Sequence, residues 1–243
     1  MTDGRYLYCI LAGIQRRNFG NIGLFGKQAY SVPYKEISAV VSNVPFKEMR
    51  PDAEIITSHQ RVVEEARGRG TILPARFGII FKSDDGVKKM LIKSYKELES
   101  KITKMEGKDE FGLKIIIDGA DLRKLNLATE DNPEIKKIKR EISSSGKGTA
   151  YFLKMKMDEA IKNQTYRKID ELSGKIHREL AKTSDETCLL KADFDQIMLN
   201  AAYLVNRNDT GKFHSKLDEL KEKYQRDGLI FYSSGPWAPY SFC

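Results

Sequence analysis

The sequence predicts an α+β protein with two domains and a C-terminal tail, and three observations support this. Strand-like and helix-like patterns alternate through the first 120 of the 243 residues. A long charged helical stretch follows, and a second α+β alternation comes after it. The last nine residues hold the only Trp, two of the seven Pro, a Tyr and a Phe. We therefore expect domains over residues 1–120 and 121–234, and a tail over 235–243.

The strands of the first domain are predicted from short apolar runs. Residues 5–11 and 37–41 are compact, and residues 27–32 are a weaker run that ends at Pro33. Residues 71–81 are also strand-like, but a Pro, an Arg and a Gly interrupt them. This predicts a strand pair or a bent edge strand.

Two helices lie between these strands. Pro51 and Asp52 supply N-terminal residues for the first helix, which ends near Gly68, and the second begins near Ser83. A β-branched strand over residues 111–117 closes the domain. The order β-(β-β)-α-β-α-β is close to the split βαβ layout, so we expect a modified ferredoxin-like domain with helices on one face of its sheet.

The second domain is predicted to begin with helices. From Asn132 to Lys182 the pattern is helical, with a break at residues 143–148. The stretch 150–182 predicts one helix of roughly 45–50 Å at 1.5 Å per residue. An α+β unit completes the domain, with a strand, a strand, a helix and a strand expected over residues 188–190, 197–205, 211–226 and 229–232.

The charge of the chain is positive and uneven. The net charge is +8, and residues 133–182 carry 13 basic and 7 acidic residues. Such a surface can attract nucleic acid, acidic lipid or an acidic protein, and a solvated helix face has the same composition. Because no apolar run approaches 18 residues and no signal sequence opens the chain, we expect a cytoplasmic protein without a transmembrane helix.

Motifs for catalysis are weak throughout. Three Cys and three His lack metal-ligand spacing, and Cys9 is expected to be a core thiol. His59 lies on the apolar face of the first helix, where a core histidine is the favoured interpretation. Neither residues 20–26 nor 145–149 match a nucleotide-binding loop, and no nucleophile elbow is present. We expect no enzymatic activity, no cofactor and no metal.

Protein binding is favoured over nucleic-acid binding. Residues 136–140 and the basic helix could neutralise phosphates, which keeps a basic nucleic-acid-binding α+β module as the alternative. However, aromatic residues are sparse there and the RNP pattern is absent.

The composition of the tail predicts that it packs against a protein surface. Its prolines exclude a helix and a central strand, and Trp237, Tyr240 and Phe242 can each bury roughly 150–250 Å². Because the tail follows directly on the last strand, docking on its own domain is the simplest expectation. Docking on another protein is the alternative.

Three segments of the chain resemble, in the same order, the signatures of the gas vesicle protein F/L family (GvpF/GvpL). They are Leu73-Pro74-Ala75-Arg76-Phe77-Gly78, Asn200-Ala201-Ala202-Tyr203-Leu204-Val205 and Gly235-Pro236-Trp237-Ala238-Pro239-Tyr240-Ser241-Phe242, and the opening Tyr6-Leu7-Tyr8 is similar too. Ala75 and Ala238 depart from the family pattern, which often has Leu and Pro there. The structural signature residues are Leu73, Pro74, Gly78, Asn200, Ala201, Ala202, Tyr203, Gly235, Pro236 and Pro239.

The resemblance implies a minor, non-enzymatic component of gas vesicles, the gas-filled protein shells that give microbes buoyancy. It implies a fold of two α+β domains. It also implies that the protein binds the small hydrophobic shell protein and other accessory proteins, and that this binding prevents aggregation of the shell protein during nucleation. The expected location is cytoplasmic and associated with gas vesicles, with no nucleic acid, membrane or small-molecule substrate as partner. The candidate partner-binding residues are Arg76, Phe77, Trp237, Tyr240 and Phe242.

Overall fold

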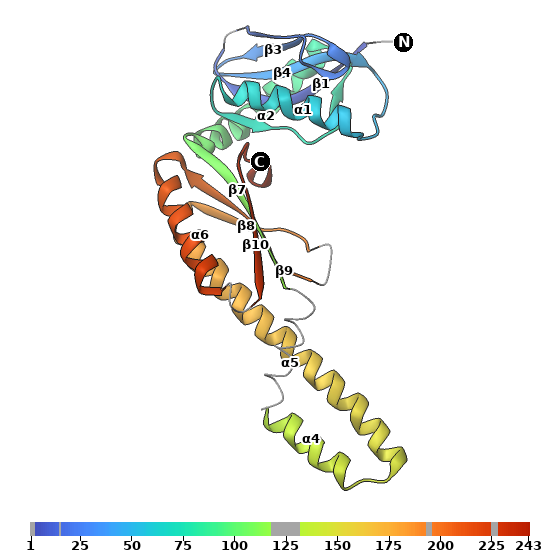
Figure 1. The fold of residues 1–243 in the computed structure, drawn as a ribbon. Coiled ribbons are helices and arrows are strands. Elements are labelled where there is room, and N and C mark those ends of the chain that lie inside the picture. Colours follow the sequence, from blue (N-terminus) through green and yellow to red (C-terminus); the bar gives the residue numbers. More distant parts are fainter. Residues whose placement is uncertain (1–2, 15, 118–131, 193–195, 225–227) are drawn as a thin grey trace. The chain divides into compact units, whose positions relative to one another are not determined.

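The computed structural model describes residues 3–14, 16–117, 132–192, 196–224 and 228–243. Within these ranges the chain has an α+β fold with two antiparallel sheets and five α-helices (Figure 1). It forms two compact units. Unit 1 combines Met1–Glu110 with Gly235–Cys243, and unit 2 is Phe111–Ser234. The predicted boundary at residue 120 lies outside the described residues.

Unit 1 is built on a six-stranded sheet whose centre is β1. The strand order is β2-β3-β4-β1-β5, and β6 also pairs with β1. The predicted bent strand at residues 71–81 is two short strands, β5 and β6, which both pair with β1. The bounds are β1 Asp3–Ala12, β2 Asn18–Gly20, β3 Ala29–Tyr34, β4 Ile37–Pro45, β5 Ile72–Pro74 and β6 Ile80–Phe81.

Two capped helices complete unit 1, α1 (Ala53–Arg67) and α2 (Asp84–Met105). The Asp52 carboxylate accepts the Ile55 N–H at 2.8 Å, and the Ser83 hydroxyl accepts the Gly86 N–H at 3.2 Å. These bonds satisfy amide groups that have no partner inside the helix. The helix starts predicted from the sequence are confirmed.

The two helices cover opposite faces of the sheet. Tyr6 of β1 contacts His59 of α1, whereas its neighbour Arg5 places Nε 2.7 Å from the Asp84 carboxylate of α2. Neighbouring residues of a strand point to opposite faces. The expectation that helices cover one face is therefore wrong, and the continuous apolar run of β1 reflects burial on both sides.

Unit 2 contains a four-stranded sheet in the order β10-β7-β9-β8. The strand expected to close the first domain, residues 111–117, is β7 of this second sheet, because an apolar pattern predicts a strand but not its neighbours. The last strand, β10, continues to Trp237 at the sheet edge, where Pro236 can be tolerated. The bounds are β7 Lys108–Ile117, β8 Glu186–Leu189, β9 Ile197–Asn206 and β10 Leu229–Trp237.

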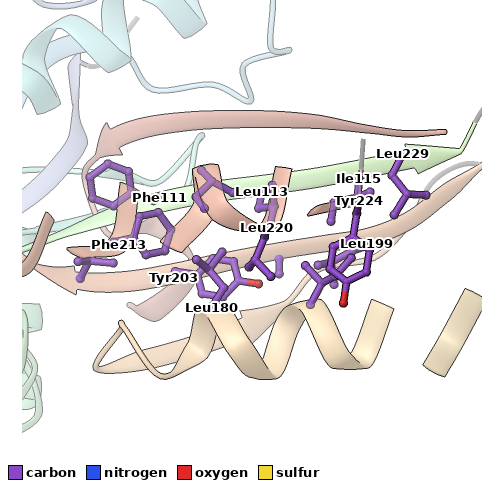
Figure 2. Close-up of a cluster of buried hydrophobic side chains, with 14 of the residues drawn as sticks. Phe111, Leu113, Ile115, Leu180, Leu199, Tyr203, Phe213, Leu220, Tyr224 and Leu229 are labelled. Atoms are coloured by element: carbon purple, nitrogen blue, oxygen red, sulfur yellow. The ribbon is translucent and has the colours of Figure 1, made fainter. Parts of the chain in front are cut away.

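Three helices accompany this sheet, α4 (Pro133–Ser143), α5 (Lys147–Ala181) and α6 (Thr210–Tyr224). The predicted break between α4 and α5 is confirmed, and the 35 residues of α5 make a helix of about 52 Å. The end of α5 and one face of α6 form a core with the sheet (Figure 2). None of the helices in the described ranges is both long and apolar enough to cross a bilayer.

Candidate partner-binding groove at the C-terminal tail

The tail of the chain packs on unit 1. Ala238 is fully buried and belongs to the core cluster that contains Tyr6, Tyr8 and Val63. Pro239 is also buried, and a single 3-10 turn, Tyr240–Phe242, follows. The tail therefore docks on its own chain, against residues that are far away in the sequence.

A buried carboxylate holds the end of the tail. Glu110 accepts the Ser241 N–H through Oε2 and the Ser241 hydroxyl through Oε1, both at 2.8 Å. Burial raises the pKa of Glu110, and the two hydrogen bonds from Ser241 act in the opposite direction. Charge-assisted bonds in a buried site are among the stronger ones, so this contact fixes the tail.

An arginine of α1 lies at the start of the tail. The Arg67 guanidinium is 2.7 Å from Glu64 and 2.9 Å from Asp109, and it reaches the Pro236 carbonyl at 3.5 Å. Neither Arg67 nor Glu110 stands out in the sequence, where carboxylates and basic residues are scattered. Their role in holding the tail is visible only from their contacts with Pro236 and Ser241 in the structure.

An aromatic cluster centred on His59 joins the tail to the first strand. The His59 ring lies 5.6 Å from the rings of Tyr6 and Tyr8, 6.3 Å from Phe77 and 6.5 Å from Tyr240. His59 is buried, as the sequence predicts, and burial lowers its pKa to about 4. It is therefore neutral at pH 7. We call these five rings the His59 cluster.

Two hydrogen-bond contacts of the Tyr6 hydroxyl connect the His59 cluster to the chain that follows β5. The Tyr6 hydroxyl accepts the Gly78 N–H at 3.3 Å and lies 2.9 Å from Nδ1 of His59. Which of these two atoms donates depends on the tautomer of His59. The Phe77 ring lies beside the His59 ring and the Gly78 N–H bonds the Tyr6 hydroxyl, so residues 77 and 78 tie the segment after β5 to the His59 cluster.

Gly78 is required by its backbone conformation. Its φ is +88°, and a Cβ placed there would meet nothing within 4 Å. We expect Gly78→Ala to destabilise unit 1 by about 1–2 kcal/mol through backbone strain alone. Urea unfolding measures this change. The control is Gly86→Ala, where φ is not positive and the nearest atoms are at 3.7 Å or more. Equal losses at both positions would contradict the prediction.

A groove opens between the tail and α1. Its volume is about 440 Å³, and Trp237 and Tyr240 line it together with Thr57, Gln60, Arg61, Glu64 and Glu110. Trp237 is 48% exposed and Tyr240 is 41% exposed, although the two residues between them, Ala238 and Pro239, are buried. Aromatic rings beside a cleft on a fixed backbone are typical of binding sites. We call this site the tail groove.

The other predicted partner-binding residues lie outside the tail groove. Arg76 is exposed between β5 and β6, and within the described residues it makes no ion pair. Phe77 is half-buried in the His59 cluster, and Phe242 is half-buried in the last turn. Leu73 and Pro74 are buried in β5. No cluster of metal-ligating side chains occurs in the part of the chain that the structure describes.

The second of the three signature segments lies in unit 2 and not in unit 1. Asn200, Ala201, Ala202 and Tyr203 lie in β9 of unit 2. The Tyr203 hydroxyl is 2.9 Å from Nδ1 of His177, a tyrosine–histidine pair like the one between Tyr6 and His59. The first and third segments thus meet at the His59 cluster, and the second contributes to the core of unit 2.

Comparisons with known proteins point to one family along nearly the whole chain. A family model described as "Gas vesicle synthesis protein GvpL/GvpF" matches residues 4–243. Gas vesicle protein F1 of Halobacterium salinarum is 27% identical over 246 residues, covering 100% of this chain and 93% of that protein. Gas vesicle protein L1 of the same organism is 22% identical, covering 100% and 91%. The crystal structure of GvpF from Anabaena sp. PCC7120 aligns with a TM-score of 0.85 at 20% identity, covering 99% and 98%.

Proposed function

Since the chain belongs to the GvpL/GvpF family of gas vesicle synthesis proteins, we propose that it acts as a minor, non-enzymatic assembly component. In this role it binds the hydrophobic shell protein and prevents its aggregation during vesicle nucleation. The observation that carries the proposal is the tail groove, with two half-exposed aromatic rings on a backbone that is held in place.

The tail groove suits a partner with apolar side chains. A shell protein exposes apolar surface before it assembles, and large exposed patches of this kind aggregate. Trp237 and Tyr240 can cover part of such a patch. Because Glu110 and Ala238 already hold the tail, ordering the rings on binding costs little conformational entropy.

The remaining candidate residues belong to the same proposal. Arg76 is exposed and can contact a partner directly, whereas Phe77 and Phe242 are half-buried and can position the contacting rings. We also infer that unit 1 is a modified ferredoxin-like domain. The order β1, β2–β4, α1, β5–β6, α2 supports this inference, and the additional strands before α1 and the two helices on opposite faces of the sheet are the modifications.

Trp237→Ser tests the proposal against a matched control. We expect the wild-type chain, at equimolar concentration, to slow the aggregation of purified shell protein, measured by light scattering. Trp237→Ser should weaken shell-protein binding at least tenfold, about 1.4 kcal/mol. The control, Tyr232→Ser, removes a ring that is 55% exposed and outside the tail groove, and it should bind like wild type.

Two results would contradict the proposal. One is a wild-type chain that does not slow aggregation. The other is a Trp237→Ser variant that binds and protects the shell protein as the wild type does. Far-UV circular dichroism of both variants should be unchanged, which separates lost binding from lost folding.

A further inference from the structure

The helix α5 has two apolar stripes, and one of them is uncovered. One side of its first half packs against α4, where Ile135 and Ile138 are buried. Leu153 and Met157 on that side of α5 are half-buried. The other stripe faces away from α4 and consists of Tyr151, Phe152, Met155 and Tyr166.

This second stripe, which we call the outer stripe, is strongly exposed. Tyr151 and Phe152 are 70% and 69% exposed, more than any other large apolar side chain described, and Met155 is 57% exposed. Tyr151 and Met155 are one helical turn apart and Tyr166 follows three turns later, so they lie on one side of the helix, with the exposed Glu159 and Lys162 between Met155 and Tyr166. The line is about 22 Å long at 1.5 Å per residue.

The surroundings of the outer stripe are basic. Residues 133–168 carry ten basic and four acidic residues, a net charge of +6. Lys154 and Lys156 flank Met155, and the Lys162 ammonium lies 5.8 Å from the centre of the Tyr166 ring. A second copy of this chain would bring like charges together, which disfavours self-association through this face.

The pattern selects one class of partner. Apolar side chains at helical spacing on a convex surface fit the apolar face of another helix, which packs side chains between side chains. Stacking of nucleic-acid bases requires exposed rings along a groove, whereas the rings of the outer stripe lie on the convex surface of a helix. The basic residues on either side require acidic residues on the partner.

We propose that the outer stripe binds an acidic amphipathic helix of a partner protein. The partner helix carries apolar residues at i, i+3, i+4 and i+7, flanked by Asp or Glu that face Lys154, Lys156 and Lys162. The proposal goes beyond the tail groove, since it uses residues of unit 2 and does not require the shell protein.

Synthetic helical peptides test whether the outer stripe of the full-length chain prefers an acidic helix to a basic one. The first probe is a 21-residue fluorescent peptide with Leu at heptad positions a and d and Glu at e and g, whose like charges oppose its own dimerisation. The second probe has Lys at e and g. By fluorescence anisotropy, the wild-type chain should bind the Glu peptide at least tenfold tighter than the Lys peptide. Binding should weaken as salt is raised.

Three variants locate the binding site. Tyr151→Ser/Phe152→Ser/Met155→Gln should weaken Glu-peptide binding at least tenfold. Lys154→Glu/Lys156→Glu should reverse the preference and bind the Lys peptide more tightly, a gain that misfolding cannot produce. The control is Ile92→Ser, which removes a side chain that is 53% exposed on α2 in unit 1 and should leave binding unchanged.

Several outcomes would overturn the proposal. They are equal binding of the two peptides, no binding of either, and a charge-reversed variant that keeps the original preference. Tighter binding of a 20-base-pair DNA duplex or of phosphatidylserine vesicles, lost in the triple variant, would assign the stripe to nucleic acid or to lipid. A dimer in sedimentation equilibrium that the triple variant abolishes would assign it to a second copy.

Discussion

Removal of residues 235–243 is expected to destabilise unit 1 by about 3–5 kcal/mol. The deletion exposes the core that Ala238 and Pro239 cover, and it removes the contact between Tyr240 and His59. It also leaves the buried Glu110 carboxylate without the two donors of Ser241. Urea unfolding followed by far-UV circular dichroism measures the loss, since the deletion removes the only Trp.

Substitutions of Glu110 separate the hydrogen bonds from the rest of the tail. In Glu110→Gln the amide oxygen can accept the Ser241 N–H and the amide nitrogen can donate to the Ser241 hydroxyl, so we expect a small change. Glu110→Ala removes both acceptors and should cost about 1–3 kcal/mol. A truncated chain that unfolds at the wild-type urea concentration would show that the tail does not stabilise unit 1.

Acidification from pH 6.5 to pH 4 is expected to remove about 3 kcal/mol of stability from unit 1 through His59. Burial lowers the pKa of His59 to about 4 in the folded state, whereas an unfolded histidine has a pKa near 6.5. Between these values the unfolded chain binds a proton that the folded chain does not bind. The contribution is therefore complete above pH 6.5 and is lost as the pH falls towards 4.

The measurement is the free energy of unfolding of wild type and His59→Gln at intervals of half a pH unit. The variant is less stable at pH 7, but its free energy of unfolding should change much less than that of the wild type between pH 6.5 and 4. Burial also lowers the pKa of His177 in unit 2, so His177→Gln is the matched control. This variant should leave the pH dependence of the free energy of unfolding of unit 1 unchanged. A His59→Gln variant with the wild-type slope would contradict the prediction.

The sequence predicts the helices of this chain better than its sheets. The starts of α1 and α2 are marked by Asp52 and Ser83, whose caps bond amides only three residues away. Pairing of strands depends on residues that are distant in the sequence. For this reason the strand at residues 111–117 was predictable as a strand but not as a member of the second sheet, and the face of the first sheet that α2 covers was not predictable.

The same distinction applies to the candidate site. Trp237 and Tyr240 stand out in the sequence because aromatic rings are rare at a terminus. Glu110 and Arg67 do not stand out, because their role depends on partners 131 and 169 residues away in the chain. The rings that line the tail groove could thus be named from the sequence, and the residues that hold the tail could not.

The division of unit 1 between both ends of the chain has a consequence for biosynthesis. Residues 1–110 leave the ribosome first, but the segment that completes their core follows only after residues 111–234. At roughly 5–20 residues per second, the gap is on the order of ten seconds. During this time the His59 cluster lacks Tyr240 and the groove lacks both of its exposed rings. A chain that lacks residues 235–243 therefore cannot display the tail groove, so the partner binding that we propose for this groove requires these residues to have been synthesised.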